Sequence, residues 1–464
     1  MSISKFWKEA MAYRLGGGHQ ADHKALNTPS LSLDGNGNIS GMVSATGQQF
    51  TPGTAVAPYG PYLTKSLIAF TDTANDTFAN DWSTHVQMTL ESDFDAVQIG
   101  FANTRAGAIN VQTVVSVMAV AGDPTTTAVL NSAGSWANAG TGGTNTLTCP
   151  AATTTQFGMN ITWGDVVPLA SVARTDGGTL PILCVRTQQL MANNGGSNRV
   201  ISAQGGAAAN GYAFETDNSA SAPYGRLYRV RNQLVQGVTT ISTITSTANG
   251  CNNAPPIFVR YWLRNGYGRT LVVVGDSIAG AFQSTTLSGW SMMQEARRVV
   301  SSTTSPLELC VIAQSGAPLG SIATRVESVA ATLTNVAYVT PIASPNSLGV
   351  PITAATIAAE RGNYQRILTA ISNQKANVIS WTMLPVNFAA KAWGGTDALR
   401  IAMNNLRLNN ARTWARVVDP ATLLSGAADV NGQTTLVSVE ADGLHPTSVG
   451  QIAAAAAFIP VIKY

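Results

Sequence analysis

Charged side chains are scarce in this 464-residue sequence. They make up 11% of it, and 27 Lys and Arg nearly balance 24 Asp and Glu. An average soluble domain carries about a quarter charged residues. No block of like charge is present that could follow a phosphate backbone, so nucleic acid is not an expected partner. Ala, Ser, Thr, Gly and Asn are abundant instead, which predicts a neutral, hydroxyl-rich surface.

Long apolar runs are also missing. No stretch reaches the ~20 apolar residues of a membrane span, and the segment MSISKFWKEAMAYRLGGG lacks the uninterrupted apolar core of a signal peptide. We therefore expect no membrane span and no export by the usual signal route. The four cysteines share no metal-ligand spacing and are too few for a disulfide framework in this length. No cofactor is expected.

Histidine is equally rare, with four in the chain. His19 and His23 are spaced so that they could share one side of a helix and bind a metal. Three glycines precede them, however, and no acidic or Cys ligand lies nearby, so we expect no metal there. His85 lies in a strand-like run, whereas His445 lies near the C-terminus in a different kind of sequence.

The first half of the chain contains two kinds of sequence. Residues 1–58 open with a short amphipathic pattern and become rich in Gly, Ser and Asn, as in LSLDGNGNISG. This composition predicts an arm and linker, with a role in attachment. Residues 59–266 consist of short alternating or β-branched runs such as HVQMTL, DAVQIGFAN and VQTVVSVMAV, separated by turn residues. Such runs favour a β-sandwich or jelly roll.

Residues 267–464 have a different pattern. LVVVGDS is a continuous apolar run of the kind expected for a strand buried on both faces. LELCVIAQSG, VAYVTPIAS and NVISWTMLP are further candidate strands, separated by helical segments such as TAATIAAERGNYQRILTAIS. Alternating strands and helices predict a parallel, doubly wound α/β sheet. The expected fold class is therefore α/β, preceded by an all-β module and an arm.

Ser277 follows the run VVVGD, at the C-terminal end of a predicted strand, where open α/β sheets place their ligands. A helix beginning just after it would stabilise negative charge beside the hydroxyl. A serine needs a base within hydrogen-bond reach to act as a nucleophile, and the base needs a third group to orient it. His445 lies in the same region, and Asp442, three residues earlier, can accept its Nδ1 proton. Pro446 can open the Ala-rich helix that follows.

Two segments carry a family resemblance. VVVGDSIAG and DGLHPTSVGQ resemble the first and last conserved blocks of the SGNH, or GDSL-type, hydrolases, in the order and approximate separation of that family. The family consists of α/β esterases, lipases and carbohydrate deacetylases. The resemblance covers about residues 268 to 464. It implies Ser277 as nucleophile, its own N–H as an oxyanion-hole donor, and Asp442 and His445 as the rest of the triad.

The resemblance implies two more oxyanion-hole residues. Gly316 in CVIAQSGAPLG matches the second family block, whose glycine N–H joins the hole. Asn346 in IASPNSLG is nearest to the third block, normally Gly-x-Asn-Asp, but both the Gly and the Asp are replaced here. Asn387 in MLPVNF competes for the same role. Taken singly, Ser277 could be a helix N-cap and Gly316 could supply only a turn.

The expected chemistry is acyl transfer by a serine esterase. Low charge, a β-rich middle and a Gly-rich arm resemble virion-attached proteins of bacteriophages, whose esterase domains often remove O-acetyl groups from host surface polysaccharide. This resemblance implies an acylated carbohydrate substrate, a location in the phage particle, and docking of residues 1–58 to other virion proteins. Two alternatives stay open: a non-catalytic structural or receptor-binding virion protein with a degenerate hydrolase domain, and a bacterial lipase-like esterase. The sequence leaves open whether the chain forms a homo-oligomer.

Overall fold

A computed structural model divides the chain into two compact units, Met1–Gly60 and Pro61–Tyr464. In the first unit, β1 (Ser30–Leu33), β2 (Ile39–Val43) and β3 (Gln49–Phe50) form an antiparallel sheet. The segment LSLDGNGNISG, expected as linker, thus contributes to two paired strands. In the second unit the structure describes residues 61–66, 82–103, 107–120, 135–152, 158–189, 257–280, 291–314, 316–334, 336–348, 353–387, 397–408, 415–428 and 434–462, and the short strands named below.

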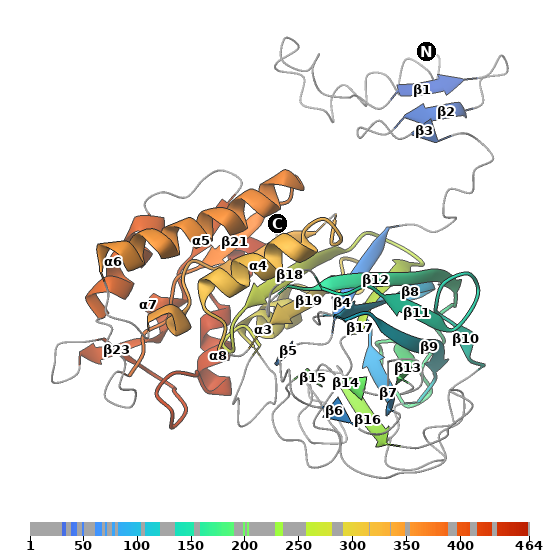
Figure 1. Cartoon of the computed structure of the whole chain (residues 1–464), viewed down its shortest axis with the longest axis horizontal. Coiled ribbons are helices and arrows are strands. Elements are labelled where there is room, and N and C mark those ends of the chain that lie inside the picture. The colour runs from blue at the N-terminus through green and yellow to red at the C-terminus, as the bar shows by residue number, and fades with distance from the viewer. Residues whose placement is uncertain are drawn as a thin grey trace. The chain divides into compact units, whose positions relative to one another are not determined.

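Two antiparallel sheets make up the first part of the second unit (Figure 1). One has the strand order β10-β9-β13-β7-β16, with β11 paired to β9, and the other has the order β12-β8-β17-β4. Two short pairs, β5 with β15 and β6 with β14, accompany them. The strands are β4 (Tyr62–Ser66), β5 (Phe70–Thr71), β6 (Thr77–Phe78), β7 (Trp82–Thr89), β8 (Phe94–Asn103), β9 (Ile109–Met118), β10 (Ala137–Asn138), β11 (Thr146–Cys149), β12 (Asn160–Pro168), β13 (Ile182–Gln189), β14 (Asn198–Arg199), β15 (Ser202–Ala203), β16 (Tyr228–Leu234) and β17 (Ile257–Leu263).

Apolar side chains at alternate strand positions join these two sheets. Val86 and Val185 belong to one sheet, and Ile99 and Val259 belong to the other; all four are buried in one cluster. β-branched residues suit this arrangement because successive side chains of a strand point to opposite faces. The expected antiparallel β-module is confirmed.

The remaining part of the unit is a parallel sheet with the strand order β19-β18-β20-β21-β22. Helices connect its strands, as the alternating pattern predicts, and the expected α/β fold is confirmed. The elements are β18 (Arg269–Gly275), α3 (Met292–Val300), β19 (Leu307–Ala313), α4 (Leu319–Val329), β20 (Ala337–Pro341), α5 (Ala354–Asn373), β21 (Val378–Trp381), α6 (Asp397–Leu408), β22 (Ala415–Val418), α7 (Pro420–Leu424), β23 (Ser425–Ala428), β24 (Thr434–Leu436), α8 (Ser448–Ala455) and α9 (Ile459–Ile462).

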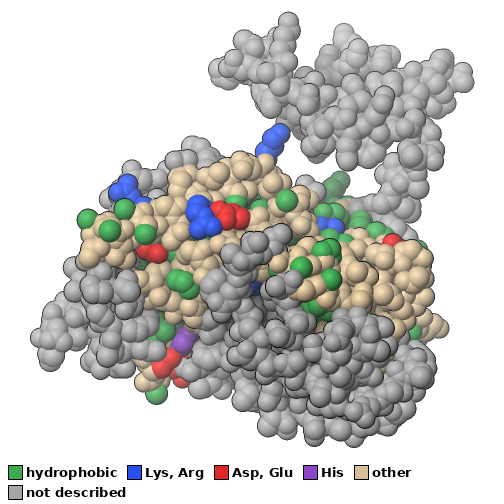
Figure 2. Space-filling model, viewed as in Figure 1, with side chains coloured by type: hydrophobic (Ala, Val, Ile, Leu, Met, Phe, Trp, Pro, Cys, Tyr) green, Lys and Arg blue, Asp and Glu red, His purple; other side chains and the backbone are tan. Residues whose placement is uncertain are grey.

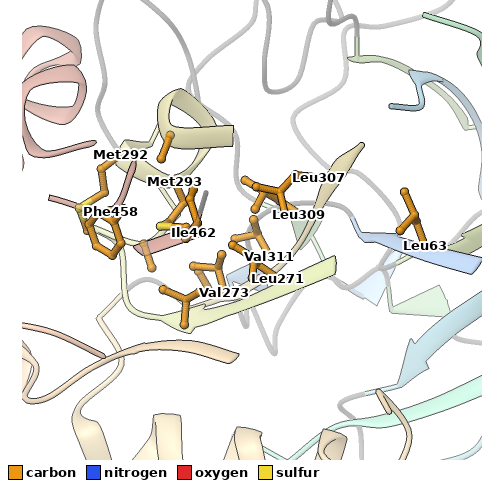
Figure 3. Close-up of a cluster of buried hydrophobic side chains, with 14 of the residues drawn as sticks. Leu63, Leu271, Val273, Met292, Met293, Leu307, Leu309, Val311, Phe458 and Ile462 are labelled. Atoms are coloured by element: carbon orange, nitrogen blue, oxygen red, sulfur yellow. The ribbon is translucent and has the colours of Figure 1, made fainter. Parts of the chain in front are cut away.

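Helices cover both faces of the parallel sheet, so its strands are apolar throughout. Val273 of β18 packs on the side of α3 and α9, with Met292 and Phe458 (Figure 3). Its neighbour Val272 points to the opposite face and packs in a cluster with Ile367 of α5. Helices α4 and α5 lie side by side on that second face (Figure 1). Burial on both faces explains the continuous run LVVV.

The β-module and the parallel sheet share their core within the second unit. Leu63 of β4 belongs to the same apolar cluster as the side chains of β18 and α3 (Figure 3). Along the edges of the two sheets, the Thr64 N–H donates to Thr270 Oγ1 (2.9 Å) and Ser66 Oγ donates to the Val311 carbonyl (2.6 Å). The predicted boundary after residue 266 falls inside this unit, between β17 and β18.

The described surface carries few charges. Figure 2 shows scattered Lys, Arg, Asp and Glu side chains on a face that is mostly neutral, in keeping with a chain that is 11% charged. Among the described residues, the structure contains no helix with the length and apolar character needed to cross a membrane.

Candidate active site

Ser277 lies directly beyond β18, at the C-terminal end of the parallel sheet. The chain runs from β18 to β19 on one side, and the later strands β20, β21 and β22 add on the other side. The strand order therefore reverses between β18 and β20, and open α/β sheets bind ligands at such a switch point.

A tight turn presents the Ser277 hydroxyl. The Gly280 N–H donates to the Asp276 carbonyl (3.1 Å), and the Ile278 N–H donates to Asp276 Oδ1 (3.0 Å). A Cβ at Gly275 would lie 2.5 Å from the Ala279 Cβ, so only glycine allows this close approach. The helix expected after Ser277 amounts to one turn over the described residues 277–280, and the next described helix is α3.

The structure brings Ser277, His445 and Asp442 into one line of hydrogen bonds. Ser277 Oγ lies 2.7 Å from His445 Nε2, and His445 Nδ1 lies 2.5 Å from Asp442 Oδ2. Ser277 is 4% and His445 6% exposed. Because a carboxylate can only accept, Nδ1 carries the ring proton and Nε2 accepts from the serine hydroxyl. This arrangement can take a proton from Ser277 and stabilise the resulting imidazolium.

Asp442 is held as a carboxylate by its own loop. Its Oδ1 accepts hydrogen bonds from the Leu444 N–H (2.9 Å) and the His445 N–H (3.1 Å). Partial burial acts to raise the pKa of Asp442, but these two bonds and the one from the His445 ring outweigh it and hold the pKa below its usual value. Gly443, with φ of 72°, makes the turn between the acid and the histidine.

Helix α8 fixes the other side of His445. Thr447 is its N-cap and accepts from the Gly450 N–H (3.3 Å), so Pro446 stands just before the cap and not in the first helical turn as expected. Gln451 on this helix accepts a hydrogen bond from the Met292 N–H (3.0 Å) at the start of α3. The cap and this contact anchor the histidine loop to the helical layer beneath it.

The candidate oxyanion-hole donors come from the ends of three neighbouring strands. Ser277 follows β18, Gly316 follows β19 with φ of 72°, and Asn346 follows β20 in a short 3₁₀ helix, Pro345–Leu348. Asn346 Nδ2 lies 3.4 Å from the carbonyl oxygen of Ala317, so its helix touches the Gly316 turn. Within the described residues, no acceptor is recorded for the N–H of Ser277 or of Gly316.

Asn387, the competing residue, has a different environment. Its Oδ1 accepts from the Leu436 N–H (2.8 Å), and its N–H donates to the Gly443 carbonyl (2.8 Å). These bonds tie the segment after β21 to β24 and to the loop that carries Asp442. Asn387 therefore supports the histidine loop, and the contacts of Asn346 with the Gly316 turn favour Asn346 as the oxyanion-hole amide.

Sequence reasoning missed Ser344, a completely buried residue after β20. Its Oγ lies 2.7 Å from Asp276 Oδ2 and 2.9 Å from the Ala317 carbonyl, so it joins the turns beyond β18 and β19. Burial raises the pKa of Asp276, and the bonds from Ser344 and the Ile278 N–H oppose this shift. The only sequence signal for Ser344 was its place in SPNS, where the family block has glycine.

Other candidate residues stand apart from this site. His19 and His23 lie outside the described residues, and among those described no group of three or more His, Cys, Asp or Glu side chains could hold a metal. Trp381 is 3% exposed and packs edge-on against Phe458. It is a core residue.

The chain has structural similarity to several hydrolases. No protein-family model and no curated protein sequence matches it. Similar solved structures include a GDSL-like lipase from Bacteroides thetaiotaomicron (16% identity, TM-score 0.32, 42% of this chain and 88% of the other). They also include a lipolytic G-D-S-L family protein from Veillonella parvula (13%, 0.32, 42% and 98%) and a carbohydrate esterase family 3 protein from Talaromyces cellulolyticus (17%, 0.30, 42% and 96%). At these TM-scores the similarity says nothing about activity, which must be inferred from the site.

Proposed function

We propose that this chain is a serine esterase that removes acyl groups, chiefly O-acetyl groups, from a carbohydrate. The observation that carries the proposal is the line of hydrogen bonds from Ser277 Oγ through His445 to Asp442, at the switch point of a parallel sheet. A serine whose proton can pass to a base oriented by a carboxylate is a nucleophile toward carbonyl carbon.

In the proposed reaction, Ser277 Oγ attacks the ester carbonyl carbon while its proton moves to His445 Nε2. The carbonyl oxygen becomes negative, and the N–H groups of Ser277 and Gly316, with the Asn346 amide, would stabilise it. His445 then gives the proton to the leaving sugar oxygen, the C–O bond breaks, and the acyl group stays on Ser277. Water that gives a proton to His445 attacks this acyl-enzyme, and the acid is released as the serine regains its proton.

The carbohydrate substrate and the phage particle are the outer parts of the proposal. Their support is the resemblance of the sequence motifs to a family that includes carbohydrate deacetylases, together with the low charge and the Gly-rich arm. Under this proposal the enzyme deacetylates host surface polysaccharide, and residues 1–58 attach it to other virion proteins.

Hydrolysis of p-nitrophenyl acetate tests the core of the proposal. We expect the wild type to be active and Ser277→Ala, with unchanged circular dichroism and Tm, to be inactive. Acetate release from a panel of acetylated bacterial polysaccharides would then identify the substrate. A wild type inert on every acetyl ester and glycan would contradict the proposal and favour a non-catalytic virion protein. Faster hydrolysis of long-chain than of acetyl esters would favour a lipase-like esterase, because a short acyl pocket rejects long chains.

A further inference from the structure

A single buried hydroxyl joins the three turns that carry the candidate oxyanion-hole donors. Ser344 Oγ contacts Asp276 beside Ser277 (2.7 Å), Ala317 beside Gly316 (2.9 Å) and the Asn346 N–H (3.2 Å). The three contacts reach the ends of β18, β19 and β20, which are adjacent strands. No other described hydroxyl has recorded bonds to all three of these turns.

Four polar atoms surround this hydroxyl. A serine has one proton to donate and two lone pairs to accept with. Two acceptors, Asp276 Oδ2 and the Ala317 carbonyl, lie within reach of its proton, and the backbone and side-chain N–H groups of Asn346 lie within reach of its lone pairs. Ser344 is completely buried, so water cannot replace any of these partners.

The same contacts orient the Asn346 amide. Its Nδ2 lies 3.3 Å from Ser344 Oγ and 3.4 Å from the Ala317 carbonyl. Because these two acceptors are only 2.9 Å apart, one N–H can be shared between them. Because the amide is planar, this shared bond also fixes the direction of its second N–H.

Ser347 supports the turn from its other side. Its Oγ accepts a hydrogen bond from the Leu319 N–H (3.0 Å) at the start of α4, where the N-cap residue Pro318 makes no side-chain bond. The two hydroxyls of SPNS thus hold the Gly316 turn at Ala317 and at Leu319. These serines occupy the two positions at which the sequence departs from Gly-x-Asn-Asp.

We propose that Ser344 is a positioning residue that sets the spacing of the oxyanion donors before substrate binds. The inference rests on the proposed esterase function. Charge on the substrate oxygen develops only in the transition state, so donors held in place act there and leave substrate binding nearly unchanged. Ser344 itself touches no reacting atom. Its loss should therefore appear in kcat and not in KM.

The test is Ser344→Ala, assayed with p-nitrophenyl acetate and with a trifluoromethyl ketone. The ketone forms an adduct with the Ser277 hydroxyl whose oxygen resembles the oxyanion. We expect kcat to fall roughly 10- to 100-fold with KM changed less than about twofold. The inhibition constant of the ketone should rise by the factor by which kcat/KM falls. Ser344→Cys, which replaces the hydroxyl by a slightly larger thiol that is a weaker donor, should give an intermediate loss.

Ser380→Ala is the matched control. Ser380 is equally buried, and its hydroxyl bonds to Tyr364 of α5 (2.6 Å) rather than to any of the three turns. It should lower Tm without changing kcat or the inhibition constant. A folded Ser344→Ala enzyme with wild-type kcat would overturn the inference, as would equal kcat losses in the two variants. If Ser344→Ala does not fold, Ser344→Cys decides by the same criteria. A wild type that hydrolyses no ester overturns the esterase proposal itself, so the two failures are distinguishable.

Discussion

Two regions around the parallel sheet bury ionisable side chains with different results. At the C-terminal end of the sheet, Ser277, His445 and Asp442 form a short relay. At the edge formed by β19, beside the β-module, lies a second group that we call the interface charge cluster, Lys65, Glu91, Arg297 and Glu308. Lys65, Arg297 and Glu308 are almost completely buried, whereas the side chain of Asp442 is 21% exposed.

The charged side chains of the interface charge cluster pair with one another. Glu308 Oε1 lies 3.2 Å from Arg297 Nη1 and 3.3 Å from Lys65 Nζ, and its Oε2 accepts from the Tyr261 hydroxyl (2.8 Å). Glu91 accepts from Ser301 Oγ (2.8 Å) and lies 3.7 Å from Arg297 Nε. The charges of the two cations and the two anions balance. Lys65 lies on β4, Arg297 on α3 and Glu308 on β19, and Glu91 follows β7. The cluster therefore forms only when the module and the sheet are assembled.

The comparison separates a closed set of ion pairs from a group of side chains that can pass on a proton. In the interface charge cluster each carboxylate accepts from partners on other elements, and the charges cancel. In the site, the Ser277 and Gly316 N–H groups have no recorded acceptor among the described residues, and the serine proton has a base to go to. Electrostatic stabilisation of a reaction requires donors aimed at the place where charge develops.

Among the variants predicted here, Asp442→Asn should have the largest effect, which is on kcat. The amide cannot hold His445 in the tautomer that accepts from Ser277, so kcat should fall about 10⁴-fold with the fold intact. Asp397→Asn is the control, because Asp397 forms the same i,i+3 pair with a basic residue, Arg400, at 2.5 Å. It should reduce stability and leave kcat within a few fold. Similar kcat losses in both variants would show that the Asp442 effect is merely structural. Steady-state hydrolysis of p-nitrophenyl acetate measures kcat for both variants.

Glu308→Gln should have the next largest effect, on stability. Removing this carboxylate leaves Lys65 and Arg297 buried with excess positive charge, so the free energy of unfolding should fall by about 3–5 kcal/mol in urea titrations. Glu327→Gln is the matched control. Its partner is Arg366 at 2.7 Å, in a pair with 42% and 40% exposed side chains, and it should cost under about 1 kcal/mol. Equal costs would mean that the cluster contributes no more than a surface pair.

His85 provides a smaller effect that depends on pH. Burial, and then the neighbouring Arg186 charge, lower the pKa of His85 to about 3, and Arg186 Nε donates to its Nδ1 (3.1 Å). An unfolded histidine titrates near 6.5, so below that pH the unfolded chain binds a proton that the native state rejects. This contribution to stability is intact above pH 6.5 and is lost progressively down to about pH 3.

Urea titrations at pH 7 and pH 5 check the His85 prediction. Between these two pH values, His85 should account for a loss of about 2 kcal/mol in the free energy of unfolding. His85→Gln cannot take up the proton, so its loss over the same interval should be smaller than that of the wild type by this amount. An identical pH dependence in the two proteins would contradict the assignment.

The relay was predictable from sequence because its signals are local. Ser277 ends an apolar run that reads as a doubly buried strand, and Asp442 and His445 are three residues apart in one loop. The parallel strands were predictable for the same reason, since continuous apolar runs alternate with helical segments. The structure adds the distances that join the C-terminal loop to Ser277.

Polar contacts between distant segments could not be predicted in this way. Glu308 sits in the apolar run LELCVIA, and its partner Lys65 is 243 positions away. In the sequence, Ser344 cannot be told from any other loop serine. Its role as a link depends on the side-by-side arrangement of β18, β19 and β20. Asn387 was a candidate donor because its side chain carries an amide, and only the structure shows that its Oδ1 and its backbone N–H bond to Leu436 and Gly443. Periodicity reports which residues are buried, not which polar atoms meet.

Covalent labelling with a fluorophosphonate, followed by peptide mass mapping, tests most directly whether Ser277 is an activated nucleophile. The reagent reacts with serines whose proton is taken by a neighbouring base, and it needs no knowledge of the substrate. We predict one adduct, on the peptide that contains Ser277, which is absent in Ser277→Ala and strongly slowed in His445→Gln. An unlabelled wild type, or an adduct on another serine with Ser277 unmodified, would contradict the account.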